Sequence, residues 1–131
     1  MDPIVLIVDD DDNVRNGLLR VLRQQPYQIL TAQTADDAIS CLKKLPVNLV
    51  LSDDRMPGMS GIELLTWVAN HYPETVRIML TGEATTKLAV RAINEAKVYR
   101  FFTKPCDHVE LALAIREALE ERALTSSPPN R

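Results

Sequence analysis

Hydrophobic and polar positions divide the chain into five cycles, each a short apolar run followed by a longer striped segment. The apolar runs are short and rich in β-branched or aromatic residues, so they predict strands. Two of them, 4–8 and 49–51, are apolar throughout, which is typical of strands buried on both faces of a parallel sheet. The predicted strands cover 4–8, 27–30, 49–51, 76–80 and 99–102.

Between these runs, apolar residues recur at spacings of three and four positions, which predicts helices with one face packed on a sheet. Thr34 opens one such segment with Asp37 three residues later, a pattern typical of a helix N-terminus. Either Asp11 or Asp12 is expected to cap the first helix. The last striped segment covers 109–124 and separates apolar from charged residues.

Five repeats of strand and helix predict an α/β fold, a doubly wound five-stranded parallel sheet with helices on both faces and right-handed crossovers. The length of 131 residues suits one domain. We assign residues 1–122 to this domain. Residues 123–131 include two prolines and lack periodicity, so we interpret them as a flexible tail or the start of a linker to an output domain.

The composition of the chain indicates which classes of partner and which cellular compartment to expect. The net charge of -3 and the pI of about 5.3 argue against direct binding of nucleic acid by this domain. Two cysteines with no zinc-site spacing and no disulfide framework favour a reducing compartment. The sequence shows neither a signal peptide nor an apolar run long enough to span a membrane, so we expect a cytoplasmic protein.

Carboxylate, hydroxyl or ammonium side chains follow four of the five predicted strands. Residues 9–12 are four consecutive aspartates, Asp53 follows the third strand, Thr81 the fourth and Lys104 the fifth. Ligands of open α/β sheets bind where the carboxyl ends of the strands meet. Each group alone has a plainer explanation as a helix cap, a strand end or a turn. Their joint occurrence at one edge of the sheet favours a functional site.

Carboxylates brought together repel one another and oppose folding unless a cation neutralises them. Mg2+ prefers a few carboxylate or carbonyl oxygens together with water. Such a site suits phosphoryl transfer, in which cations neutralise phosphate oxygens. Lys104 would provide a second cation, Thr81 a hydrogen bond, and an aspartate can act as the nucleophile.

The same residues resemble a known family, the receiver domains of two-component response regulators. The resemblance covers residues 4 to about 119 and rests on four motifs in the expected order, Val-Leu-Ile-Val-Asp-Asp at 5–10, Leu-Ser-Asp-Asp-Arg-Met-Pro-Gly-Met-Ser-Gly at 51–61, Met-Leu-Thr-Gly at 79–82 and Phe-Phe-Thr-Lys-Pro at 101–105. It implies a flavodoxin-like receiver fold with strand order 2-1-3-4-5.

By this resemblance, Asp53 is the phosphoacceptor, because it lies four residues before Pro57. Asp9 and Asp10, with Asp53 and the backbone carbonyl of Arg55, would bind Mg2+, with Asp9 acting largely through water. Lys104 would pair with the phosphoryl oxygens. Asp54 should point away from the site, and the bond between Lys104 and Pro105 is expected to be cis.

The resemblance also implies a phosphorylation-activated switch that assists its own chemistry but is not an enzyme. Thr81 and Phe101 would move on phosphorylation and change the surface of the fourth helix, fifth strand and fifth helix. The implied partners are a sensor histidine kinase or phosphotransfer protein and an output domain or downstream protein, and homodimers are common. Arg55 and Glu83 would tune the lifetime of the phosphoryl group.

Three alternatives remain open from the residues. An aspartate-nucleophile phosphatase would place its nucleophile after the first strand, where the run at 9–12 contains the Asp-x-Asp spacing, but the chain lacks a cap domain. A nucleotide-binding module would need a glycine-rich loop, which the four glycines cannot form. A degenerate receiver that only binds proteins would have lost one of the site residues.

Overall fold

The chain folds around one parallel sheet. The computed structural model describes residues 2–126, and within them the strand order is β2-β1-β3-β4-β5, which confirms the predicted fold class. Each strand is followed by a helix, and the elements are β1 (Ile4–Val8), α1 (Asp12–Leu22), β2 (Gln28–Ala32), α2 (Ala35–Lys44), β3 (Leu49–Ser52), α3 (Gly61–His71), β4 (Val76–Thr81), α4 (Thr86–Asn94), β5 (Arg100–Thr103) and α5 (His108–Ser126).

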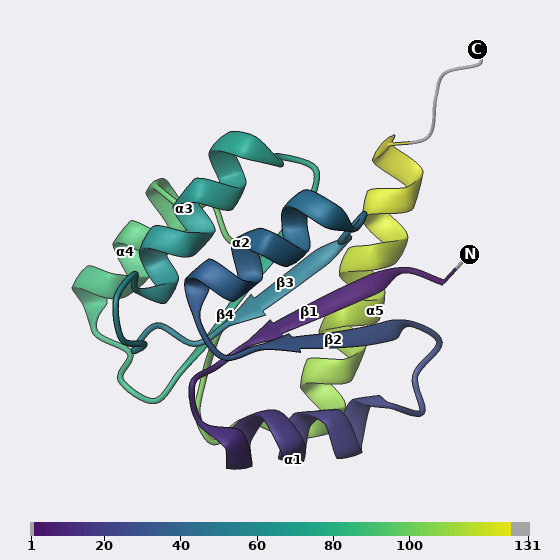
Figure 1. Cartoon of the computed structure of the whole chain (residues 1–131), viewed down its shortest axis with the longest axis horizontal. Helices are drawn as coiled ribbons and strands as arrows, with labels where there is room; N and C mark the ends of the chain where they lie inside the picture. The colour runs from purple at the N-terminus through teal and green to yellow at the C-terminus, as the bar shows by residue number, and fades with distance from the viewer. Residues whose placement is uncertain (1, 127–131) are drawn as a thin grey trace.

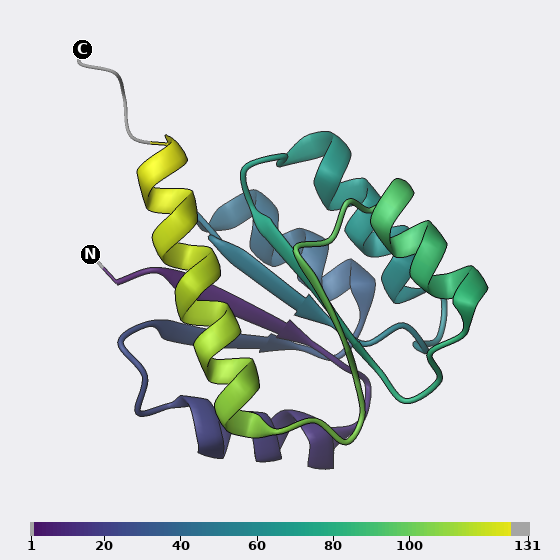
Figure 2. The same ribbon diagram turned by 180° about the vertical axis from the view of Figure 1, so that it is seen from behind.

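The helices form two layers, one on each face of the sheet. Helices α1 and α5 cover one face, and α2, α3 and α4 cover the other (Figures 1 and 2). β1 and β3 are central strands, whereas β2 and β5 form the edges. All five strands are parallel, so the loops that follow them gather at the same end of the sheet, where the carboxyl ends of the strands lie.

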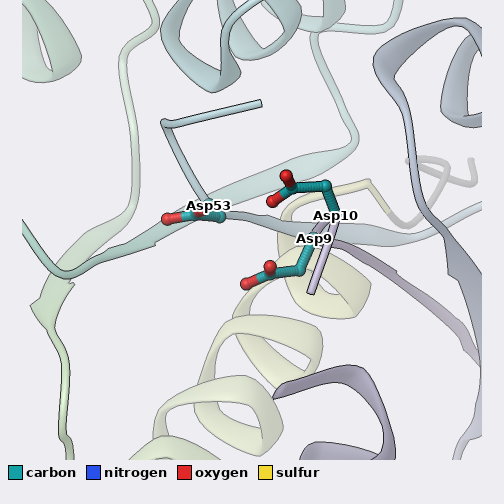
Figure 3. A group of neighbouring side chains, drawn as sticks. All are labelled: Asp9, Asp10 and Asp53. Atoms are coloured by element: carbon teal, nitrogen blue, oxygen red, sulfur yellow. The ribbon is translucent and has the colours of Figure 1, made fainter. Parts of the chain in front are cut away.

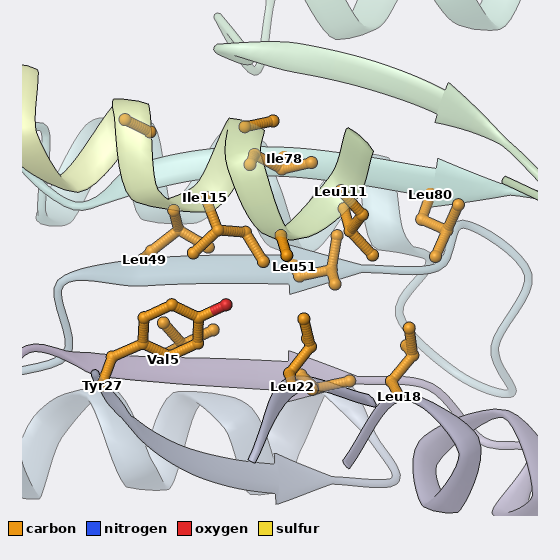
Figure 4. Close-up of a cluster of buried hydrophobic side chains, with 14 of the residues drawn as sticks. Val5, Leu18, Leu22, Tyr27, Leu49, Leu51, Ile78, Leu80, Leu111 and Ile115 are labelled. Atoms are coloured by element: carbon orange, nitrogen blue, oxygen red, sulfur yellow. The ribbon is translucent and has the colours of Figure 1, made fainter. Parts of the chain in front are cut away.

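Side chains of the strands alternate between two hydrophobic cores. In β1, Val5 and Ile7 face α1 and α5, while Leu6 and Val8 face α2 and α3. All four are almost fully buried. Figure 4 shows the first core, in which Leu111 and Ile115 of α5 lie over the sheet. Burying one such aliphatic side chain contributes about 1.5–3 kcal/mol, so both faces of β1 stabilise the fold.

Polar caps define where several helices begin. The carboxylate of Asp11 accepts hydrogen bonds from Asn13 N and Val14 N, so Asp11 rather than Asp12 caps α1. Thr34 caps α2 through Asp37 N, as predicted. At α3, Ser60 and Glu63 form a reciprocal capping box. These caps satisfy backbone N–H groups that have no partner within the helix.

The last helix is longer than the assigned domain. α5 continues to Ser126, so residues 123–126 extend the helix beyond residue 122. The rest of the segment that we interpreted as a tail or linker, 127–131, lies outside the described residues. No helix in the described part of the chain combines the length and the apolar character that a membrane crossing requires.

A guanidinium group holds the connection between α4 and β5. From β4, Arg77 donates hydrogen bonds to the carbonyl oxygens of Ala96 and Lys97 at 2.8 and 3.2 Å. It also bonds those of Pro73 and Thr75 at 3.2 and 2.6 Å. Burial lowers the pKa of Arg77. Since Lys97 adopts a φ of 50°, this clamp also stabilises a turn that non-glycine residues rarely adopt.

Candidate functional site: an acidic pocket at the carboxyl end of the sheet

Neighbouring strands bring the predicted acidic residues together. Val8 of β1 pairs with Ser52 of β3, and Asp53 N donates to Val8 O at 2.9 Å. The next residue of each strand is therefore an aspartate on the same edge. One carboxylate oxygen from each of Asp9, Asp10 and Asp53 lies within 4.8 Å of the others (Figure 3).

The pocket concentrates negative charge in a largely buried place. Asp9 is 3% exposed and Asp53 is 8% exposed, whereas Asp10 lies at the surface. Burial raises the pKa of Asp53, the charge of Asp9 raises it further, and Lys104 only partly opposes both. Ionisation of Asp53 is therefore less favourable than that of an exposed aspartate, and a cation bound in the pocket would oppose this effect.

Lys104 lies between the two buried carboxylates. Its Nζ donates to Asp9 Oδ2 at 2.8 Å and lies 3.4 Å from Asp53 Oδ1. Burial opposes the ammonium charge, but the hydrogen bond and charge of Asp9, together with the charge of Asp53, outweigh it and raise the pKa of Lys104. Lys104 N also donates to Thr81 O at 2.8 Å, and the Lys104–Pro105 bond is cis.

The donor set fits Mg2+. All three groups are carboxylates, the hard oxygen ligands that Mg2+ prefers. Asp9 already accepts hydrogen bonds at both oxygens, from Asp11 N at 3.0 Å and from Lys104. Asp10, which lies at the surface, thus has more freedom for direct contact with a cation than Asp9, which suits contact through water.

The neighbouring Asp54 is used differently. Asp54 Oδ1 accepts a hydrogen bond from Ile62 N at 2.9 Å, and Asp54 O accepts one from Gly61 N at 2.8 Å. Its side chain therefore holds the first turn of α3. This contact leaves Asp53 as the aspartate of the pair that faces Asp9 and Asp10.

The remaining predicted residues lie at the end of β4, on β5 and in the loops after β3 and β4. Thr81 is buried, and its Oγ1 accepts a hydrogen bond from Glu83 N at 3.3 Å. Arg55 Nη2 and Glu83 Oε2 form a salt bridge of 2.6 Å between two exposed side chains. Phe101 is partly buried and packs against the core under α2, α3 and α4. The roles assigned to these residues stay predictions.

Two residues near the pocket were not singled out from the sequence. Arg15 Nη1 donates to Asp9 O at 2.6 Å. Gly61 packs so closely on the turn after β3 that a Cβ atom there would lie 1.9 Å from Asp53 O. The spacing of Arg15 three positions after Asp12 was a weak signal, because such pairs on helices usually form only a surface ion pair.

The chain is similar to known proteins over nearly its whole length. A family model for the response regulator receiver domain matches residues 5–116. The hydrogenase transcriptional regulatory protein HoxA of Cupriavidus necator is 36% identical over 120 residues, which cover 92% of this chain and 25% of HoxA. This chain spans about a quarter of the length of the curated relatives that it matches.

Solved structures show the same fold. The signal receiver domain of an HD domain-containing protein from Pseudomonas fluorescens Pf-5 has a TM-score of 0.93 and 38% identity, over 97% of this chain and 93% of that chain. The beryllofluoride-activated NtrC4 receiver domain dimer has a TM-score of 0.84 and 30% identity, over 91% of this chain and 98% of that chain.

Proposed function

This chain belongs to the response regulator receiver domain family, a group of signalling switches rather than enzymes, and we propose that Asp53 accepts a phosphoryl group from a histidine kinase or phosphotransfer protein. The observation that carries the proposal is the acidic pocket. Asp9, Asp10 and Asp53 gather at one edge of the sheet, and Lys104 lies 3.4 Å from Asp53. This arrangement suits a carboxylate nucleophile with cations beside it.

In the proposed reaction, an Asp53 oxygen attacks phosphorus and forms a P–O bond. The P–N bond to the donor imidazole breaks, and its electron pair stays on nitrogen. Mg2+, when bound, neutralises phosphoryl oxygens. Lys104 is close enough to pair with the oxygens of a phosphoryl group on Asp53, which requires it to share or leave its bond with Asp9.

Phosphorylation would then change the surface formed by α4, β5 and α5. Thr81 is placed at the end of β4, and Phe101 lies on the paired strand β5, in register with Met79. Movement of Thr81 toward the phosphoryl group would free its bond with Glu83 N and let Phe101 pack more deeply. A local contact would thus bias a two-state element.

The Arg55–Glu83 salt bridge supports a role in phosphoryl lifetime. The two residues lie two positions after Asp53 and Thr81, and they connect the loops after β3 and β4. A salt bridge across these loops would hinder attack by water on the phosphoryl group.

The same surface is our candidate for self-association. Val90 and Ile93 of α4 are large apolar residues that remain exposed. The NtrC4 receiver domain is a dimer in its beryllofluoride-activated form. We therefore propose that phosphorylation promotes a homodimer through α4, β5 and α5, and that an output domain or a downstream protein responds to it.

The decisive experiment is phosphorylation with acetyl phosphate, followed by intact mass spectrometry. The wild-type chain should gain one phosphoryl group only when Mg2+ is present, and Asp53→Asn should gain none. Asp54→Asn is the matched control, because it changes the adjacent aspartate but keeps a side-chain oxygen that can accept the hydrogen bond from Ile62 N. If Asp53→Asn is still modified, or if the wild type neither gains a phosphoryl group nor binds beryllofluoride, the proposal is wrong.

A further inference from the structure

Arg15 joins the start of α1 to the end of β1. Its side chain is only 13% exposed and turns back toward the acidic pocket. Nη1 donates to Asp9 O at 2.6 Å, and Nη2 donates to the carboxylate of Asp12, which is 76% exposed. One guanidinium group therefore holds both ends of the segment that carries the acidic residues.

The hydrogen bond from Arg15 to Asp9 O is one of several hydrogen bonds that hold Asp9 in place. Asp9 N donates to Ala32 O at 3.1 Å, and its two carboxylate oxygens accept from Asp11 N and Lys104 Nζ. The carbonyl oxygen of Asp9 and the nitrogen of Asp10 share one planar peptide. Whatever holds that oxygen therefore sets the direction in which the chain continues to Asp10.

Asp10 depends on this support more than the other two aspartates. Asp9 and Asp53 are buried and contact Lys104, whereas Asp10 is exposed at the start of a loop. We propose that Arg15 is a positioning residue for the metal site: by holding Asp9 O, it preorganises the Asp10 carboxylate for Mg2+. This inference rests on the proposed function, because it assumes that the pocket binds Mg2+.

The charge of Arg15 and its hydrogen bond predict opposite effects. A guanidinium beside four aspartates repels Mg2+, so if charge were its main contribution, removing it would tighten Mg2+ binding. If positioning dominates, removing it weakens binding, because residues that orient metal ligands typically contribute about tenfold or more to affinity. The sign of the change therefore separates the two roles.

The test is calorimetric titration with Mg2+ of the wild type, Arg15→Lys, Arg15→Gln and Asp12→Asn. Lysine keeps the charge but lacks the longer, planar guanidinium that reaches Asp9 O, so both Arg15 variants should bind Mg2+ more weakly, with Arg15→Gln weaker by about tenfold. Asp12→Asn keeps the bond to Asp9 O and loses only an exposed ion pair, so its Mg2+ affinity should stay within about twofold of wild type.

A second readout is the rate of phosphorylation by acetyl phosphate at increasing Mg2+ concentration. Positioning predicts that Arg15→Gln is slow at low Mg2+ and approaches the wild-type rate at saturation. Thermal unfolding without Mg2+ shows whether each variant is folded. Tighter or unchanged Mg2+ binding in both Arg15 variants overturns the inference, and so does an equal loss in Asp12→Asn.

The outcomes also separate this inference from the proposed function. If the wild type binds no Mg2+ and accepts no phosphoryl group, both fail. If the wild type does both and the Arg15 variants match it at every Mg2+ concentration, only the positioning role of Arg15 fails.

Discussion

At the scale of single residues, Asp53 combines a buried position with a charge that the fold does not fully neutralise. Its pKa is raised from the ordinary value of 3.8 by burial and by Asp9. A carboxyl group whose pKa is higher in the folded state favours folding when protonated and opposes folding when ionised. The unfavourable contribution is therefore absent below pH 3.8 and develops as the pH rises through the raised pKa.

Asp53→Asn should consequently stabilise the metal-free protein at pH 7. We expect the Tm of the variant to exceed that of the wild type by a few degrees, and the difference to shrink as the pH falls toward 3.8. Thermal unfolding in a chelator measures this, with Asp2→Asn as a control for the loss of an exposed charge. A Tm of Asp53→Asn below that of the wild type at pH 7 would contradict the prediction.

Arg55 allows a kinetic prediction at the same scale. Arg55→Ala breaks the salt bridge with Glu83, so water should reach the phosphoryl group more easily, and dephosphorylation should be several-fold faster. The measurement is the decay of the phosphorylated mass after the donor is removed. Glu83→Gln should act in the same direction, whereas Arg23→Ala, at an exposed position at the end of α1, should not. An unchanged dephosphorylation rate in Arg55→Ala would contradict a role for Arg55 in phosphoryl lifetime.

At the scale of elements, the packing of α3 on the turn after β3 positions Asp53. A Cβ atom at Gly61 would lie 1.9 Å from Asp53 O and 2.7 Å from Asp54 Cα. Gly61→Ala should therefore displace α3 or this turn, at a cost of about 2–3 kcal/mol in the free energy of unfolding. Phosphorylation of the folded fraction should also slow.

Gly17→Ala is the matched control, because nothing lies within 4 Å of the Cβ atom that it would add. This residue is inside α1, where alanine is favoured over glycine by about 0.5–1 kcal/mol, so the variant should be slightly more stable than the wild type. The free energy of unfolding of both variants and of the wild type is measured by urea unfolding. Equal stabilities of Gly61→Ala and wild type would show that α3 accommodates the methyl group.

The clamp formed by Arg77 supports the element that carries the proposed switch. Arg77→Gln should leave several of four carbonyl oxygens without their donor and lower the free energy of unfolding by roughly 2 kcal/mol. Hydrogen exchange should accelerate most between α4 and β5, where Val98 N and Tyr99 N donate to Ala92 O and Arg77 O. Exchange that accelerates evenly over the whole sheet would argue against a local clamp.

At the scale of the whole molecule, the apolar residues of α4 allow a test of self-association. Ile93 is 61% exposed, so Ile93→Glu should not disturb the monomer but should weaken an interface on this face. Light scattering with size-exclusion chromatography should show a larger species for the wild type with beryllofluoride and Mg2+, and a monomer for the variant. Leu45→Glu, at the end of α2, is the control. A wild type that stays monomeric with beryllofluoride bound contradicts the dimer.

Much of the fold and part of the site could be predicted from local patterns. The apolar run at 4–8 coincides with β1, and the cap at Thr34 was expected from its spacing with Asp37. Such features depend on side-chain periodicity and on hydrogen bonds between residues close in sequence. The gathering of Asp9 and Asp53 at the carboxyl end of the sheet also followed from the predicted parallel sheet, whereas the pairing of β1 with β3 was expected only from the resemblance.

Contacts between residues that are distant in sequence, or that lie on either side of a loop, could not be predicted from the sequence pattern. Gly61 has an ordinary place in a turn motif, and only the path of the chain after β3 shows that no side chain fits there. Arg77 meets carbonyl groups up to 20 residues away, and any strand residue provides such carbonyls. The alternation of strands and helices follows from periodicity along the chain, and the strand order was expected only from the resemblance to receiver domains. The partners of Arg15, Gly61 and Arg77 depend on three-dimensional distances that periodicity does not encode.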